Sequence, residues 1–142
     1  MLGQIMNEKI TNPTDCISLL LPYAKKKQEH FGIIFLDSGK NVISKKVLFI
    51  GTCNKTFISV REIFWEACKK NAVAIIAFHN HPSGDTAPSL EDVESTKAIK
   101  KAGELMEIQL LDHIIISKDS YYSFCEHNFF DESESENCVA EK

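Results

Sequence analysis

The sequence predicts an α/β protein in which helices cover both faces of a mixed β-sheet, an α-β-α sandwich. The first observation is the order of segments with helical or strand-like hydrophobic spacing: helix, two strands, helix, strand, helix, two strands. The second is composition. The chain has 142 residues, 44% of them hydrophobic and 25% charged, which suits one globular domain around one core.

The first helix is predicted to start in the Thr-Asn-Pro-Thr-Asp stretch at residues 11–15 and to run to Gln28. Its apolar residues recur at helical spacing, with Lys25 to Lys27 in its last turns, and Pro22 is expected to kink or shorten it. Two apolar runs follow on either side of an Asp-Ser-Gly-Lys turn. They predict a β-hairpin, with strands at residues 31–36 and 42–50.

The rest of the chain predicts two more helices and three more strands. Ser59 is a suitable cap for a helix, and Gly103 is expected to end another. A short apolar run with β-branched residues before the second of these helices is typical of a central strand. The predicted ranges are a helix over 60–71, the central strand over 73–78, a helix over 89–101, and strands over 108–117 and 121–124.

The domain organisation follows from these segments. Residues 1–12 are predicted to be an N-terminal extension and residues 13–128 one domain. Residues 129–142 are acidic with few bulky apolar groups, so they predict a disordered tail.

Charge and cysteine usage narrow the class of protein. The formal net charge is -4, which disfavours a dedicated nucleic-acid binder, although local lysine clusters exist. The five cysteines are odd in number and form no C-x-x-C pair, so they indicate reduced thiols rather than a disulfide framework. With no signal peptide or apolar run of about 20 residues, we expect a cytoplasmic protein without a membrane partner. The oligomeric state is left open.

The chemically dense stretch follows the predicted central strand. His79 and His81 are two residues apart at a strand end, so both imidazoles point to the same side. Asp92 lies in the first turn of the next predicted helix, whose N-terminus should return to the strand end. Two nitrogens and one oxygen, with a fourth position left for water, are typical of a catalytic zinc site. The sequence therefore predicts one zinc ion held by these three residues.

Plainer interpretations exist for each part of this pattern. A lone His-x-His is weak, and Ser89 with Asp92 would also make a good helix cap. The stretch fits neither an HNH nuclease, whose residues are dispersed, nor a zinc nucleobase deaminase, which needs H-x-E and P-C-x-x-C. His113 is expected to be a buried, satisfied histidine, and Thr96 could support Asp92 from one turn away. His30 and His127 have no partners visible in the sequence.

The complete pattern resembles a known family. His79-x-His81, seven residues, Ser89, two residues and Asp92 match the JAMM motif H-x-H-x7-S-x2-D. The longer string HNHPSGDTAPSLEDVEST, with GELM at 103–106 and LLDHIII at 110–116, resembles the bacterial RadC family over roughly residues 14–125. This resemblance implies the Jab/MPN fold, which is related in architecture to the cytidine deaminases.

The resemblance also implies roles for two more residues. A glutamate at the start of the first strand would serve as general base, and Glu29 occupies that place, with Glu62 as the second candidate. Ser89 would donate a hydrogen bond to a developing oxyanion. The implied activity is that of a zinc-dependent peptidase or isopeptidase acting on a peptide or protein substrate.

A nucleic-acid-associated role is the alternative, as a recombination or repair accessory or a metal-dependent nuclease. Full-length RadC-like proteins usually carry a helix-hairpin-helix domain before this region, and the sequence shows none. That difference and the net acidity disfavour the alternative. A third hypothesis, a binding module with a vestigial metal site, is disfavoured by the intact motif.

Overall fold

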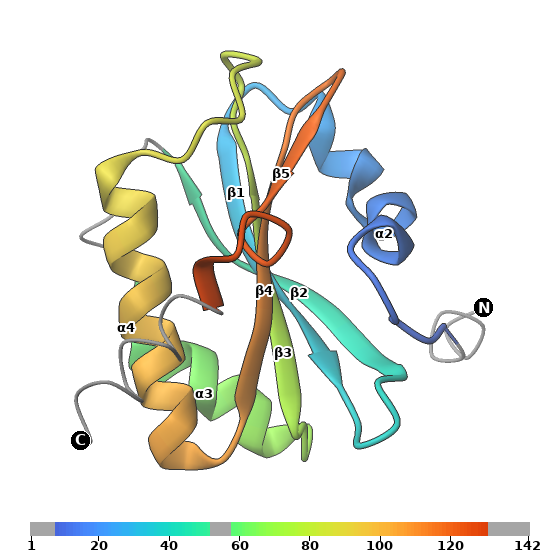
Figure 1. Ribbon diagram of the computed structural model, residues 1–142, viewed down its shortest axis with the longest axis vertical. Helices are drawn as coiled ribbons and strands as arrows, with labels where there is room; N and C mark the ends of the chain where they lie inside the picture. The colour runs from blue at the N-terminus through green and yellow to red at the C-terminus, as the bar shows by residue number, and fades with distance from the viewer. Residues whose placement is uncertain (1–7, 52–57, 131–142) are drawn as a thin grey trace.

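The computed structural model describes residues 8–51 and 58–130. The elements are α2 (Thr14–Ala24), β1 (Glu29–Leu36), β2 (Val42–Gly51), α3 (Val60–Lys69), β3 (Ala74–Asn80), α4 (Leu90–Met106), β4 (Gln109–Ile116) and β5 (Tyr121–Ser123). The five strands form one sheet of order β2-β1-β3-β4-β5, in which only β3 and β4 are parallel neighbours. Helix α2 covers one face of the sheet, and α3 and α4 cover the other (Figure 1). The predicted α-β-α sandwich around a mixed sheet is thus confirmed.

The core consists of two apolar layers, one on each face of the sheet. Successive side chains of β1 point to opposite faces and so contribute to both layers: Ile34 faces the α2 side, and Ile33 faces the α3 and α4 side. Strand β3 is buried along its whole length, as a strand with neighbours on both edges and helices on both faces should be. The predictions of a β1–β2 hairpin and of a central strand before the histidines are both confirmed.

Two predicted helix ends are wrong. Helix α2 ends at Ala24 rather than Gln28, soon after Pro22, which lacks the N–H that would bond the preceding turn. Lys25 to Lys27 therefore lie in the connection to β1 and not in a last helical turn. Helix α4 runs past Gly103 to Met106, and its left-handed cap is Glu107, with φ of 59°.

Gly103 is needed for a different reason than helix termination. A Cβ atom at this position would lie 2.4 Å from the carbonyl oxygen of Ile108. The same region is closed by a hydrogen bond of 2.9 Å from Ile108 N to Gly103 O. The glycine thus permits the close approach of the chain that turns from α4 into β4.

The structure describes only part of the predicted N-terminal extension and little of the predicted tail. Residues 8–12 of the predicted N-terminal extension are described, and there Ile10 is buried in the core on the α2 side. Residues 1–7 of that extension and residues 131–142 of the predicted tail lie outside the described part of the chain. Within the described residues, no helix is both long and apolar enough to cross a membrane.

Candidate metal centre

The two histidines of the motif meet at the end of β3. The Nε2 atoms of His79 and His81 are 3.0 Å apart, and their ring centroids are 4.8 Å apart. His79 is buried, whereas the side chain of His81 is 12% exposed. Asn80 between them points to the other side of the strand. Its side chain donates to Gln28 O in the α2–β1 connection and accepts from His30 N in β1.

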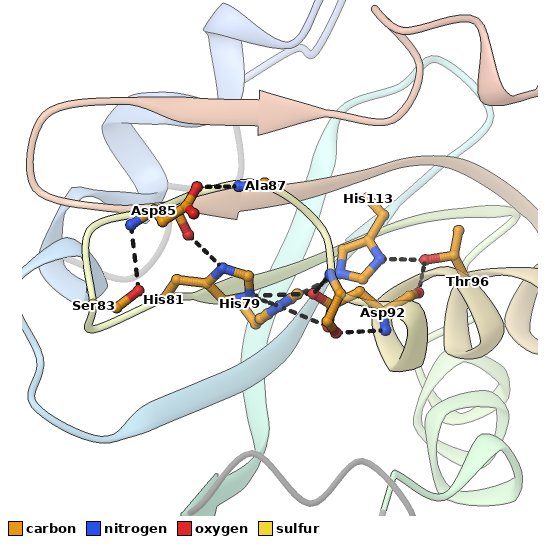
Figure 2. A network of polar contacts seen from close by, with 9 residues as sticks. His79, His81, Ser83, Asp85, Ala87, Asp92, Thr96 and His113 are labelled. Atoms are coloured by element: carbon orange, nitrogen blue, oxygen red, sulfur yellow. Dashed lines mark hydrogen bonds and ion pairs between the residues drawn. The ribbon is translucent and has the colours of Figure 1, made fainter.

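Asp92 completes the cluster from the first turn of α4. Its Oδ1 atom lies 3.2 Å from His79 Nε2, and its Oδ2 atom lies 3.2 Å from His81 Nε2 (Figure 2). The helix start is fixed by a capping box, in which Ser89 Oγ accepts from Asp92 N and Ser89 N donates to Asp92 Oδ2. The capping box therefore fixes both the start of α4 and the position of the Asp92 carboxylate.

The cluster has the size of a metal site. One ligand atom from each of His79, His81 and Asp92 can be chosen so that all lie within 4.8 Å of one another. The closest atom pairs, at 3.0, 3.2 and 3.2 Å, compare with an edge of about 3.3 Å for a tetrahedral zinc ion with ligands at about 2.0–2.1 Å. Two imidazoles and a carboxylate are also ligands that suit zinc. The donor set thus fits a metal ion, whose identity it does not fix.

The electrostatics of the cluster favour a bound cation. Burial by itself would raise the pKa of the Asp92 carboxyl, but the His79 and His81 imidazoles that contact the carboxylate outweigh it and hold the pKa well below its ordinary value. Burial would lower the pKa of His81, yet the Asp92 carboxylate and the Asp85 carbonyl raise it above its ordinary value. Glu29 contributes to this rise through its charge. Negative charge and lone pairs therefore converge where a cation would bind.

Two residues with implied catalytic roles lie at this end of the sheet. Glu29 begins β1, two residues before Phe31, which pairs with His79 and stacks on its ring at 6.0 Å. Continuing the antiparallel register by two residues would set Glu29 opposite His81. Ser89 is a helix cap, as its plainer interpretation predicted, but accepting from Asp92 N leaves the proton of the hydroxyl for another bond. The catalytic roles of Glu29 and Ser89 stay predictions.

Other singled-out residues fall away from the cluster. Glu62 is an exposed residue in the first turn of α3, where its peptide N–H donates to the Ser59 cap. His30 contacts the Gln28 carbonyl through Nδ1. His127 stacks on Tyr122 with ring centroids 4.0 Å apart.

One residue at the site was underestimated from the sequence. His113 is buried, as predicted, but its Nε2 atom lies 2.9 Å from His79 Nδ1. Thr96 contacts the other nitrogen of His113, at 2.6 Å, rather than the Asp92 carboxylate. The only available signal was strand order, because a parallel β3–β4 pair sets His113 beside Ala77, two residues before His79.

Fold and site together define a mixed α/β domain with a His-His-Asp cluster at the end of its central strand. Residues 10–129 match the RadC-like JAB domain family, and the chain belongs to that family. It is 43% identical over 134 residues to a UPF0758 protein of Staphylococcus haemolyticus, covering 92% of this chain and 59% of that protein. It is 46% identical over 127 residues to a UPF0758 protein of Staphylococcus aureus, covering 89% of this chain and 56% of the relative. The chain thus spans little more than half the length of these relatives.

Proposed function

We propose that this protein is a zinc-dependent hydrolase that cleaves a peptide or isopeptide bond. The observation that carries the proposal is the convergence of His79, His81 and Asp92 at one end of the sheet, where one ligand atom from each lies within 4.8 Å of the others. Membership of the RadC-like JAB domain family supports the proposal. The spacing of these residues also matches the JAMM motif, which implies a zinc-dependent peptidase or isopeptidase. A zinc ion at this position would supply an activated water and polarise the bond to be cleaved.

The residues of the chain have distinct tasks in this proposal. His79, His81 and Asp92 would hold the ion. Glu29 takes the proton of the attacking water and passes it to the leaving nitrogen, as a general base and then a general acid. Ser89 donates its hydroxyl proton in a hydrogen bond to the oxyanion, while its oxygen stays bound to Asp92 N. The odd number of cysteines and the lack of a C-x-x-C pair in the sequence suit a reducing compartment, so we place the reaction in the cytoplasm.

A library of peptide and isopeptide substrates tests the proposal directly. The protein is loaded with zinc after chelation, and cleavage products are identified by mass spectrometry. We expect cleavage by the wild type that is lost after chelation, restored by zinc and absent in His81→Ala. Lack of cleavage across the library by protein that holds stoichiometric zinc would count against a peptidase, without affecting the metal site.

A metal-dependent nuclease is the second candidate, and one observation favours it. A hollow of about 510 Å³ borders His81 and the loop after it, and four of its lining residues are lysines: Lys25, Lys26, Lys27 and Lys118. Such a rim attracts negative charge, either phosphates or acidic residues that flank a scissile peptide bond. Single- and double-stranded oligonucleotides therefore belong in the same screen. Cleavage of DNA but of no peptide, lost in His81→Ala, would establish the nuclease instead.

A further inference from the structure

A buried chain of hydrogen bonds runs behind His79, on the side away from the candidate metal. His79 Nδ1 lies 2.9 Å from His113 Nε2, and His113 Nδ1 lies 2.6 Å from Thr96 Oγ1. Thr96 Oγ1 in turn lies 2.7 Å from the main-chain oxygen of Asp92. The chain therefore starts at one candidate ligand and ends at the backbone of another, linking β3, β4 and α4 (Figure 2).

The last contact sets the direction of the whole chain. The carbonyl oxygen of Asp92 can only accept, so the single hydroxyl proton of Thr96 is donated to it. Thr96 Oγ1 must then accept from His113, which places the proton of a neutral His113 on Nδ1. His113 Nε2 is left as an acceptor, and it receives the Nδ1 proton of His79. The reverse direction would leave two oxygens 2.7 Å apart without a proton between them.

The consequence at the site is a fixed tautomer of His79. With its proton on Nδ1, a neutral His79 presents the lone pair of Nε2 toward His81 and Asp92, where a metal ion would bind. His81 reaches the same state by another route, because its Nδ1 lies 2.8 Å from the Asp85 carbonyl, to which it can only donate.

The environment of His113 holds this arrangement in place. Its ring stacks on Phe124, with centroids 4.9 Å apart and an interplanar angle of 8°, and it packs at a steep angle against Phe31, with centroids 5.8 Å apart. Thr96 and His113 are both buried. A ring confined in this way cannot turn over to exchange its two nitrogens without displacing the aromatic side chains around it.

We propose that His113 and Thr96 are positioning residues that lock His79 in the tautomer needed for metal binding. The inference rests on the metal site of the proposed function but concerns residues that do not touch the ion. Partners of this kind orient a ligand imidazole and raise its affinity for metal. Thr96 adds a link to the backbone of Asp92, so that the two ligands are aligned by one chain.

The direction of the chain can be observed without metal, substrate or mutation. Long-range proton–nitrogen correlation spectra of the metal-free wild type, at mildly alkaline pH, report which nitrogen of each imidazole carries the proton. We expect both His79 and His113 to carry it on Nδ1. A proton on Nε2 of His113 would overturn the inference.

The zinc affinity of paired variants tests whether these hydrogen bonds support metal binding. Thr96→Val keeps the shape of the side chain and removes the hydroxyl, whereas Thr96→Ser retains the hydroxyl. We expect the Kd for zinc, measured by chelator competition, to rise about 10–100-fold in Thr96→Val and to stay near the wild-type value in Thr96→Ser. His113→Phe should show the same loss while keeping the stacking on Phe124.

The possible failures of this test are separable. Melting curves of the metal-free variants show whether each protein is folded. Wild-type affinity in a folded Thr96→Val would overturn the positioning role. A wild type that binds no zinc would overturn the proposed metal site, while the spectra still decide the direction of the chain.

Discussion

His79 Nε2 lies 3.2 Å from Asp92 Oδ1, although His79 belongs to the central strand and Asp92 to the first turn of the helix that follows it. The loop between them folds back so that the start of α4 faces the end of β3. The Ser89 capping box holds that helix start, and the same carboxylate that closes the box contacts both histidines. The cap and the candidate metal site therefore share one side chain.

The first prediction concerns the metal ligands. His81→Ala removes one of three ligands from the more exposed side of the site, so zinc binding should be largely lost while the fold is kept. Elemental analysis of tag-free protein, purified without chelator, measures this: near one zinc per chain in the wild type and little in the variant. His127→Ala is the matched control and should retain the metal. Metal-free wild type after reconstitution with zinc would refute the site.

The second prediction separates the general base from metal binding. Glu29→Gln keeps the size of the side chain and removes the carboxylate. It should bind zinc normally and lose about 10²–10⁴-fold in the rate of hydrolysis of whichever substrate the screen identifies. Glu62→Gln, an exposed carboxylate in α3, should keep wild-type turnover. If the Glu62 variant is inactive and the Glu29 variant active, the assignment passes to Glu62.

The third prediction addresses the two tasks of Ser89. Ser89→Ala removes the acceptor for Asp92 N, which should cost about 1 kcal/mol in the free energy of unfolding. If the hydroxyl also serves the oxyanion, turnover should fall about 10²–10³-fold. Both quantities are measured on the same zinc-loaded variant by denaturant titration and steady-state kinetics. Loss of stability with unchanged kcat would leave Ser89 as a cap alone.

The fourth prediction concerns the lysine-lined hollow. Lys26→Glu reverses one charge in the rim next to His81, and it should raise KM for an anionic substrate while leaving kcat nearly unchanged. The effect should shrink as salt is added, because the attraction is screened. Lys101→Glu, an exposed position on α4, is the control for net charge. Equal changes in KM for the two variants would mean that the hollow has no special role.

The fold could be predicted from the sequence because its signals are local. Hydrophobic spacing and capping residues predicted the elements, and the ends that failed have particular causes. Helix α2 stops early after Pro22, and Gly103 permits a close approach to Ile108 instead of ending α4. A glycine at a close chain approach and a glycine at a helix end look the same in sequence, since the difference lies in a distant contact.

The site also has a part that local sequence predicts and a part that depends on distant contacts. His79, His81 and Asp92 were found because the strand-loop-helix geometry fixes their spacing over a short stretch of chain. The part played by His113 depends on the pairing of β4 with β3, a long-range relationship that no spacing reports. The predicted burial of His113 did not indicate this part either, because buried histidines are common without any link to a metal site.

A last feature is the buried carboxylate of Glu66 on α3. It is surrounded by the ammonium groups of Lys46, Lys69 and Lys70, at 2.9, 3.3 and 2.7 Å. The hydrogen bonds from Lys70 and Lys46 hold the pKa of Glu66 at about 2, against an ordinary value of 4.5. The ion pair between Lys46 and Glu66 links the edge strand β2 to α3.

The fifth prediction follows from the sign of that shift. A carboxyl whose pKa is lower in the folded state stabilises the protein above its unfolded pKa, and this contribution disappears as the pH falls from about 4.5 toward 2. Glu66→Gln should therefore lower the free energy of unfolding by about 1–3 kcal/mol at neutral pH. The difference from wild type should shrink below pH of about 4.5, as urea titrations across this range would show. Glu104→Gln, which breaks an exposed pair with Lys100, should cost less than about 1 kcal/mol. A difference between Glu66→Gln and wild type that stays constant down to the lowest pH would show that packing, not charge, explains the contribution of Glu66.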